Sequence, residues 1–270
     1  MSKQSALKQA VKRTFDRLFI KQPRVRRLVT KLAYGNGLKK ITLLGTEYVV
    51  DTVRENGYLR ASRLSSRSQF LSHELDVLNV CCVIAAEVDY FLDVGANVGT
   101  VAGTVAQTLR YCGKPTKVIA FEAHPNTFIR LKINAAAIGF DAYNCALSDC
   151  PRELDFVDGA VSHVFTTFEN ASGYNIKSEV IRVEANTLDA VSPPHGTIAL
   201  KIDVEGQEAE VVHGARALLE ARRIKHIYFD GLKDYALLAE LASHGFECSD
   251  MTSGGPATDK SFRIIASLKP

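Results

Sequence analysis

The stretch Tyr90-Phe-Leu-Asp-Val-Gly-Ala-Asn-Val-Gly-Thr100 joins an apolar run to a glycine-rich turn. The run is too short and too unpatterned for an amphipathic helix, so it predicts a buried parallel strand over 91–94. Gly95 and Gly99 let the backbone turn tightly and approach a ligand, because neither has a Cβ. A helix is expected from 98 to 110. Strand, glycine turn and helix form the first half of a nucleotide-binding α/β unit.

Details of this turn distinguish between possible nucleotides. A dinucleotide-binding turn needs three glycines, so that a pyrophosphate can lie on the helix N-terminus. Here Asn97 stands at the middle position, and no third glycine follows. Asp93 precedes the first glycine by two residues, where it would repel a pyrophosphate but suit a cationic ligand. S-adenosylmethionine carries an ammonium and a sulfonium, and the turn therefore favours it as the ligand.

A second strand and helix strengthen this hypothesis. The apolar run 118–121 ends in Glu122, and a helix is expected over 126–137. A carboxylate at this strand end is placed to accept hydrogen bonds from both ribose hydroxyls of a nucleoside. The alternative is that Asp93 and Glu122 only cap helices, which acids do well at helix N-termini.

A third polar cluster follows the strand expected over 198–203. Alternation along the strand puts Lys201 and Asp203 on one side, and Glu205 extends the series. Open α/β sheets bind ligands at the C-terminal ends of their parallel strands. These side chains are therefore expected to border the same cleft as the glycine turn.

Five segments, in this order along the chain, resemble the successive motifs of FkbM-type S-adenosylmethionine-dependent methyltransferases. They are Phe91-Leu-Asp-Val-Gly-Ala-Asn-Val-Gly99, Ala120-Phe-Glu-Ala-His-Pro125, Asn144-Cys-Ala-Leu-Ser148, Thr187-Leu-Asp189 and Lys201-Ile-Asp-Val-Glu-Gly-Gln-Glu208. The resemblance covers about residues 70–230. It implies an α/β fold of the class I methyltransferase (Rossmann-like) type, with a seven-stranded, mostly parallel sheet and helices on both faces.

The resemblance also implies a function and a site. The function is O-methylation of a hydroxyl on a sugar, a glycan or another small-molecule acceptor. The cofactor pocket is expected to hold Asp93, Gly95, Asn97 and Gly99, with Glu122 at the ribose and Ala146, Leu147 and Ser148 on the adenine side. One departure concerns the acceptor side, since Asp230-Gly231 stands where the family often has a glutamate.

Methyl transfer to a neutral hydroxyl benefits from a base that removes its proton as the new bond forms. Asp203 is the first candidate, because it lies at a strand end facing the cleft, and Glu205 and His73 follow. The alternative for Asp203 and Glu205 is a structural role, either capping the next helix or holding Lys201 in an ion pair. His163 lies in the excursion before the strand at 198, where acceptor-binding elements are common in such enzymes.

The basic residues gather at one end of the chain. Residues 1–40 hold twelve Lys or Arg and one acid, whereas the other 230 residues hold 21 basic and 29 acidic residues, for a net charge of +3. Apolar residues recur at helical spacing over 7–19 and again over 25–32. A basic helical leader and hairpin extension is therefore expected over 1–70, and the methyltransferase domain over 71–270.

Four roles for the leader are open. Its helices can pack on the domain as a lid, or be attracted to an anionic membrane, as a peripheral contact, or to a lipid-linked substrate. A basic organelle transit peptide is a third option. Nucleic acid is the fourth and is not favoured, because no aromatic stacking platform accompanies the charge.

The remaining local patterns predict a hairpin over 41–51 around Gly45, a loop over 54–68 and a helix over 72–87. One further helix is expected to run from about 206 to 222. Helix 235–243 and two last strands, over 246–248 and 262–266, complete the sheet.

Cysteine usage and hydropathy bound the class of protein. The six cysteines form no C-x-x-C pair and, like the seven histidines, show no zinc-ligand spacing, so no metal site is expected. Free thiols, the lack of an apolar run near the ~20 residues of a membrane span and the lack of a secretory signal predict a cytoplasmic protein. A nicotinamide-dependent oxidoreductase and a non-catalytic S-adenosylmethionine- or membrane-binding protein are the alternatives. The sequence leaves the oligomeric state open.

Overall fold

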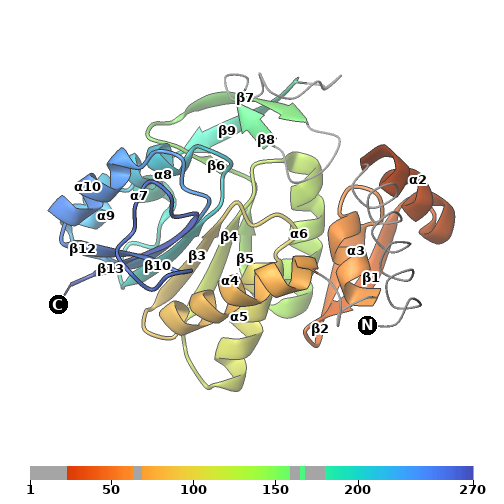
Figure 1. Ribbon diagram of the computed structural model, residues 1–270, viewed down its shortest axis with the longest axis horizontal. Helices are drawn as coiled ribbons and strands as arrows, with labels where there is room; N and C mark the ends of the chain where they lie inside the picture. Colours follow the sequence, from red (N-terminus) through yellow and green to blue (C-terminus); the bar gives the residue numbers. More distant parts are fainter. Residues whose placement is uncertain (1–22, 64–68, 159–164, 168–179, 270) are drawn as a thin grey trace, which may run out of the picture.

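The computed structural model describes residues 23–63, 69–158, 165–167 and 180–269, and its centre is a seven-stranded sheet (Figure 1). From one edge to the other the strands are β12 (Phe246–Asp250), β13 (Arg263–Leu268), β11 (Ile224–Asp230), β10 (Ile198–Ile202), β3 (Tyr90–Val94), β4 (Lys117–Phe121) and β5 (Asp141–Tyr143). Only β13 runs against its neighbours. Numbered along the chain, the order is 6-7-5-4-1-2-3, and this is the predicted class I methyltransferase sheet.

Helices cover both faces of this sheet, because alternate residues of each strand point to opposite sides. In β3, Phe91 joins an apolar cluster with α4 (Gln69–Ala85) and α5 (Thr100–Tyr111). Leu92 joins the cluster on the other side of the sheet. The helices of that other side are α7 (Leu188–Val191), α8 (Glu208–His213), α9 (Arg216–Glu220) and α10 (Ala236–Ser243), while α6 (Pro125–Ile138) contributes to the first cluster.

A smaller four-stranded sheet lies between β5 and β10 in the chain. Its spatial order is β6 (Ala146–Leu147), β9 (Val180–Asn186), β7 (Arg152–Asp158) and β8 (Phe165–Thr167). Figure 1 shows this sheet above the ends of the central strands. The excursion that the sequence places here therefore contains a sheet of its own, while His163 lies outside the described residues.

The N-terminal part consists of α2 (Pro23–Tyr34), the hairpin β1 (Leu38–Leu43) and β2 (Thr46–Asp51), and α3 (Asn56–Arg63). Asn134 of α6 joins this part to the glycine turn, since its amide nitrogen donates to the carbonyl oxygens of Val49 (3.1 Å) and Val98 (2.8 Å). Tyr48 Oη donates to the carbonyl oxygen of Thr100 at 3.2 Å. The hairpin is therefore tied to α5 and α6 by buried polar contacts.

Two expectations about local structure are wrong. Residues 56–63, expected to lie in a loop, form α3, because Tyr58, Leu59 and Ala61 are buried against the hairpin. The helix expected up to residue 222 is divided into α8 and α9. The carboxylate of Asp189 accepts hydrogen bonds from the backbone N–H groups of Ala217 and Leu218, and thus caps a new helix start.

The other predicted elements are present with bounds shifted by a few residues. The hairpin turns at Leu44 and Gly45, both with positive φ, as a two-residue hairpin loop requires. The helix expected over 25–32 is α2. The helix expected over 7–19 lies outside the described residues.

Candidate functional site

The glycine turn after β3 alternates left-handed backbone positions at Gly95, Asn97 and Gly99, with φ of 77°, 53° and 84°. Asparagine tolerates this conformation better than most residues with a side chain, which explains why it can replace the middle glycine. A Cβ on Gly95 would lie 1.9 Å from the carbonyl oxygen of Asp203. Glycine is therefore required at 95 by the close approach of the β10 end.

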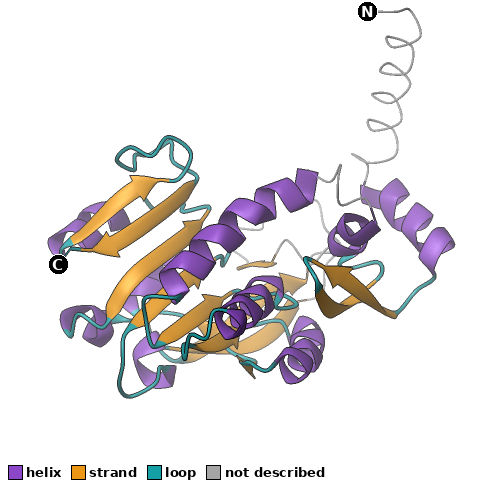
Figure 2. Ribbon diagram, turned by 90° about the horizontal axis from the view of Figure 1, so that it is seen from below, coloured by secondary structure: helices purple, strands orange, loops and turns teal. Residues whose placement is uncertain are grey.

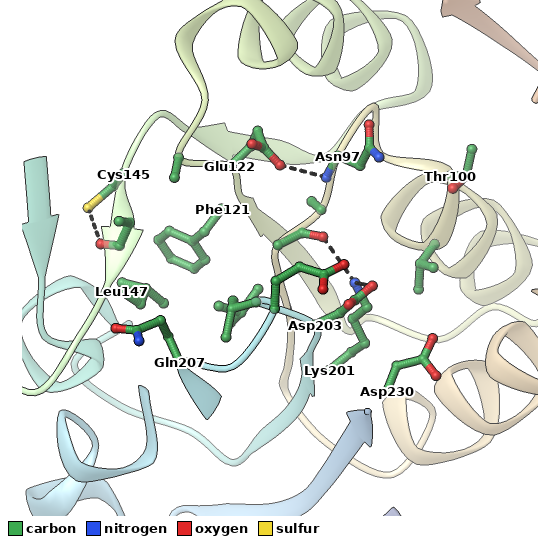
Figure 3. A pocket seen from close by; sticks show the side chains of 18 of the residues that line it. Asn97, Thr100, Phe121, Glu122, Cys145, Leu147, Lys201, Asp203, Gln207 and Asp230 are labelled. Atoms are coloured by element: carbon green, nitrogen blue, oxygen red, sulfur yellow. Dashed lines mark hydrogen bonds and ion pairs between the residues drawn. The ribbon is translucent and has the colours of Figure 1, made fainter. Parts of the chain in front are cut away.

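A large pocket opens beside this turn and contains about 1110 Å³, including the part open to solvent. Figure 3 shows its two ends, with Phe121, Cys145 and Leu147 on one side and Lys201, Asp203 and Asp230 on the other. We call them the cofactor end and the acceptor end. The cofactor end consists of Gly95, Ala96, Asn97, Phe121, Glu122, Ala123, Cys145, Ala146, Leu147, Leu154 and Phe156, and the acceptor end of Tyr58, Glu74, Lys201, Asp203, Glu205 and Asp230.

Glu122 organises the cofactor end. Its carboxylate accepts hydrogen bonds from the backbone N–H groups of Asn97 (2.8 Å) and His124 (2.9 Å), so it holds the glycine turn against the end of β4. Burial raises the pKa of Glu122 to about 7, against the lowering effect of these hydrogen bonds. A carboxylate has further lone pairs beyond these two bonds, and these remain for ligand hydroxyls.

The residues of this end fit S-adenosylmethionine. Among the described residues, the buried side-chain oxygen Oδ1 of Asn97 has no hydrogen-bond partner. An unsatisfied buried acceptor is costly, so this atom fits a ligand that brings a donor, such as an ammonium group. The apolar walls, Phe121 and Leu147 among them, suit a purine ring.

Lys201 contacts residues at the ends of both β3 and β10, and so joins the two ends of the pocket. Its ammonium nitrogen lies 3.1 Å from Oδ1 of Asp93 and 3.5 Å from Oδ2 of Asp203, and it donates to the carbonyl oxygen of Gly95 at 3.1 Å. Although burial alone would lower it, the two carboxylates hold the pKa of Lys201 well above its usual range. Lys201 is thus a charged clamp between the β3 and β10 ends, and the ion pair considered for Asp203 is present.

Asp93 lies behind the pocket and is absent from its lining. It is fully buried, and its Oδ2 accepts a hydrogen bond from the backbone N–H of Ala102 at 3.0 Å, in the first turn of α5. The geometry is therefore that of the helix-capping alternative. Its predicted contact with the cofactor has no support in this arrangement.

Two more of the predicted cofactor residues are placed away from the lining. A Cβ on Gly99 would lie 2.7 Å from Leu131 Cδ1, so this glycine serves the packing of α6. Ser148 is buried, and its hydroxyl accepts from Arg152 at 2.8 Å. Gly95, Asn97, Glu122, Ala146 and Leu147 all line the pocket.

Of the three proposed bases, the structure brings Asp203 and Glu205 into the acceptor end. The side chain of His73 lies outside the described residues, although its backbone belongs to α4. Glu205 has a positive φ of 55°, and Gly206 follows with 101°. A non-glycine residue held in this conformation costs free energy, and such residues concentrate at functional sites.

The acceptor end is rich in carboxylates whose pKa values are raised. Burial raises the pKa of Glu74 to about 7. Partial burial, and next the negative charge of Asp203, raises the pKa of Glu205 to about 7, although the residue as a whole stays exposed. Burial, followed by the charge of Asp203, also raises the pKa of Asp230, which accepts a hydrogen bond from Arg263 at 3.2 Å. Glu74 and Glu205 can therefore take up and release protons near neutral pH.

Sequence reasoning missed two residues of this end. Tyr58 comes from α3, where a loop was expected, and its side chain is buried beside Thr100. Glu74 had a usable signal, because it precedes Val77 and Leu78 by three and four residues on the buried side of α4. An acid on an apolar helix face points to a site.

No group of three or more potential metal ligands occurs in the part of the chain that the structure describes. Within the same residues, no helix combines the length and apolar character that a membrane span needs.

Comparison with known proteins identifies relatives of the chain. The family model for the methyltransferase FkbM domain matches residues 93–248, which is more than half of the chain. The hexuronic acid methyltransferase AglP of Haloferax volcanii is 29% identical over 157 residues. This match covers 57% of the chain but only 62% of that relative's length.

Comparison with solved structures finds methyltransferases at low identity and with low TM-scores. The Pyrococcus abyssi tRNA (uracil-54, C5)-methyltransferase, in complex with S-adenosyl-L-homocysteine, has a TM-score of 0.44 at 10% identity, over 87% of this chain and 44% of that one. A TehB-like SAM-dependent methyltransferase from Corynebacterium glutamicum has a TM-score of 0.40 at 13% identity, over 80% of this chain and 99% of that one.

Proposed function

Since the chain belongs to the FkbM family of S-adenosylmethionine-dependent methyltransferases, we propose that it methylates a hydroxyl oxygen of a sugar, a glycan or another small-molecule acceptor. Family membership decides against the nicotinamide-dependent alternative. The AglP relative is named a hexuronic acid methyltransferase, and this name supports a sugar as the acceptor of the present chain.

The observation that carries the proposal is the position of Glu205. It lines the same pocket as Asn97 and Glu122, and its pKa of about 7 is suited to a general base at neutral pH. Asp203, by contrast, has its carboxylate 3.5 Å from the Lys201 ammonium. We therefore assign proton removal to Glu205 and the positioning of the β10 end to Asp203.

The residues then divide the work. When bound, S-adenosylmethionine supplies a methyl group on a positively charged sulfur. Glu122 and Asn97 hold its ribose and ammonium groups, and the apolar walls exclude water from the cofactor end. Glu205 would accept the hydroxyl proton while the acceptor oxygen forms its bond to the methyl carbon and the sulfur–methyl bond breaks, its electron pair staying on sulfur. The products are a methyl ether, the neutral thioether S-adenosylhomocysteine and a protonated Glu205. Alignment of the two substrates in one pocket supplies much of the acceleration.

Turnover on a panel of methyl glycosides tests this proposal. The full chain is incubated with S-adenosylmethionine and each glycoside, S-adenosylhomocysteine release is followed, and the product is analysed by mass spectrometry. We expect a methyl ether on a ring hydroxyl. Methylation only of amines, or cofactor binding without turnover on any hydroxyl acceptor, would reject it, the second result favouring a non-catalytic binding protein.

A further inference from the structure

The outermost helix, α2, has two contrasting sides. Thr30 is 5% exposed and Tyr34 packs against the apolar cluster of the hairpin, so this side faces the protein. Leu28, Val29 and Leu32 point the other way, with exposed fractions of 58%, 48% and 78%. They lie one and four residues apart, which places them on one helix face. Figure 1 shows α2 at the periphery of the molecule, beyond the hairpin.

Positive charge borders these apolar side chains. Lys31 lies on the same helix and is exposed, and the ammonium of Lys39, at the start of β1, lies 5.5 Å from the centre of the Tyr34 ring. We call Leu28, Val29, Lys31 and Leu32 the α2 face. Along the sequence, no Asp or Glu occurs between Asp16 and Glu47, while residues 23–40 contain six Lys or Arg. Within this stretch of the sequence, the charge is therefore of one sign.

This combination selects among possible occupants. Exposed leucine and valine side chains beside lysines match the interface of an anionic bilayer, where the apolar groups enter the acyl boundary and the ammonium groups meet the lipid phosphates. Nucleic acid would use the charge but offers no partner for aliphatic side chains, since its bases stack on aromatic ones. A second copy of the chain would bring a like charge against the first.

We propose that the α2 face is a peripheral docking site for an anionic lipid membrane. A helix of 12 residues, as α2 is, lies along the surface and does not cross it. The proposal is independent of the methyl-transfer assignment, because no residue of the α2 face lines the pocket.

Co-sedimentation of the full chain with vesicles tests the proposal. We expect binding to vesicles of phosphatidylcholine mixed with phosphatidylglycerol, and none to vesicles of phosphatidylcholine alone. Raising the salt concentration from 0.1 M to 1 M shortens the Debye length from about 10 Å to about 3 Å, and it should release the protein. Absence of binding to the mixed vesicles, or binding that is equal on both kinds, overturns the proposal.

Point variants locate the contact. The double variant Leu28→Ser/Leu32→Ser should lower vesicle binding roughly tenfold or more, because two leucines no longer enter the bilayer. Ile129→Ser/Ile133→Ser is the matched control, since these residues are also four apart on a helix and are 55% and 41% exposed. It should bind as the unaltered chain does. Equal loss in both variants, or no loss in the first, overturns the proposal.

Three further measurements exclude other occupants of the α2 face. If Leu28→Ser/Leu32→Ser sharply lowers the melting temperature, another part of the chain covers these residues. If light scattering shows a dimer that the variant abolishes, the face joins two copies. If a fluorescent single-stranded oligonucleotide binds the chain and prevents vesicle binding, the face serves nucleic acid. Each of these results contradicts membrane docking, which predicts a stable variant, no such dimer and no competition.

Discussion

The two ends of the pocket differ in charge and in origin. The cofactor end is mainly apolar with one carboxylate, Glu122, whereas the acceptor end gathers four carboxylates around Lys201. The cofactor end is formed by the segments at the ends of β3 and β4, by β6 after β5, and by Leu154 and Phe156 of β7. The acceptor end draws on α3, α4 and the ends of β10 and β11, which are far apart in the chain. The comparison teaches that segments next to the central strands form the first end, while the second depends on contacts between distant parts of the chain.

The largest expected effect distinguishes proton removal at the acceptor end from cofactor binding at the cofactor end. Glu205→Gln should reduce turnover by roughly 10²–10⁴, the usual range for a lost general base, and leave S-adenosylmethionine affinity nearly unchanged. Single-turnover methyl transfer at saturating cofactor, alongside calorimetric titration, measures both quantities. Near-normal turnover in a folded Glu205→Gln protein would move the search for the base to Asp203 and His73.

The same assignment predicts the pH profile. A base acts only when ionised, so turnover should fall as the pH drops below about 7, the pKa to which Glu205 is raised, and level off above it. In Glu205→Gln the residual rate should lose this dependence. If the variant keeps the same profile, another group controls the reaction.

The next effect concerns the clamp that joins the ends. Lys201→Met leaves the buried carboxylate of Asp93 without its counter-charge, and breaking a buried pair in this way typically costs about 3–5 kcal/mol of stability. Denaturant unfolding measures the loss. The double variant Lys201→Met/Asp93→Asn removes both charges and should recover most of it. If the double variant loses as much free energy of unfolding as Lys201→Met, the ammonium stabilises the fold mainly through its contacts with Gly95 and Asp203.

A smaller effect is confined to the cofactor end. Glu122→Gln should weaken S-adenosylmethionine binding about tenfold, because a hydrogen bond to a charged group is worth ~1.5–3 kcal/mol. Turnover at saturating cofactor should change little. Glu184→Gln, an exposed change on β9, is the control for calorimetry. If Glu122→Gln affects turnover but not affinity, the division into two ends is wrong.

The smallest effect probes acceptor charge. Two acceptors are compared, neutral methyl glucoside and the uronate methyl glucuronide. The uronate brings a carboxylate toward the carboxylates of the acceptor end, which are Glu74, Asp203, Glu205 and Asp230. Because like charges repel, the glucoside should be the better acceptor. Glu74→Gln removes one charge at nearly constant shape and should raise the relative kcat/KM for the uronate roughly two- to fivefold. If the unaltered chain already prefers the uronate, the carboxylates of the acceptor end do not repel an acidic acceptor. Its acceptor would then resemble the hexuronic acid in the name of the AglP relative.

The difference between the ends also explains what the sequence could predict. The glycine turn and Glu122 directly follow the strands that place them, so local patterns suffice to bring Gly95, Asn97 and Glu122 to the lining. Ala146 and Leu147 are expected there only from the family resemblance. Asp93 shows where this reasoning stops. Its position at the end of β3 follows from sequence, but its direction depends on the Ala102 N–H and on Lys201, which only the packed fold brings beside it.

The acceptor end is harder to predict from sequence, because its residues also come together only in the packed fold. Tyr58 reaches the pocket because α3 packs on the hairpin, and Glu74 because α4 packs against β10 and β11. Spacing along the chain does not encode the first contact, whereas the position of Glu74 three and four residues before the buried Val77 and Leu78 is a signal for the second. The fold class, by contrast, depends on buried strands alternating with helices, which hydrophobic periodicity specifies well.

The hydrogen bonds of Asn134 have a consequence for how the molecule opens. One amide group accepts from the backbone N–H of Val49, donates to its carbonyl and also donates to the carbonyl of Val98 inside the glycine turn. Detaching the hairpin would therefore leave a buried amide and part of the turn unsatisfied. The hairpin and the turn should lose amide-exchange protection together, as one cooperative unit, and tight cofactor binding should slow exchange in the distant hairpin as well.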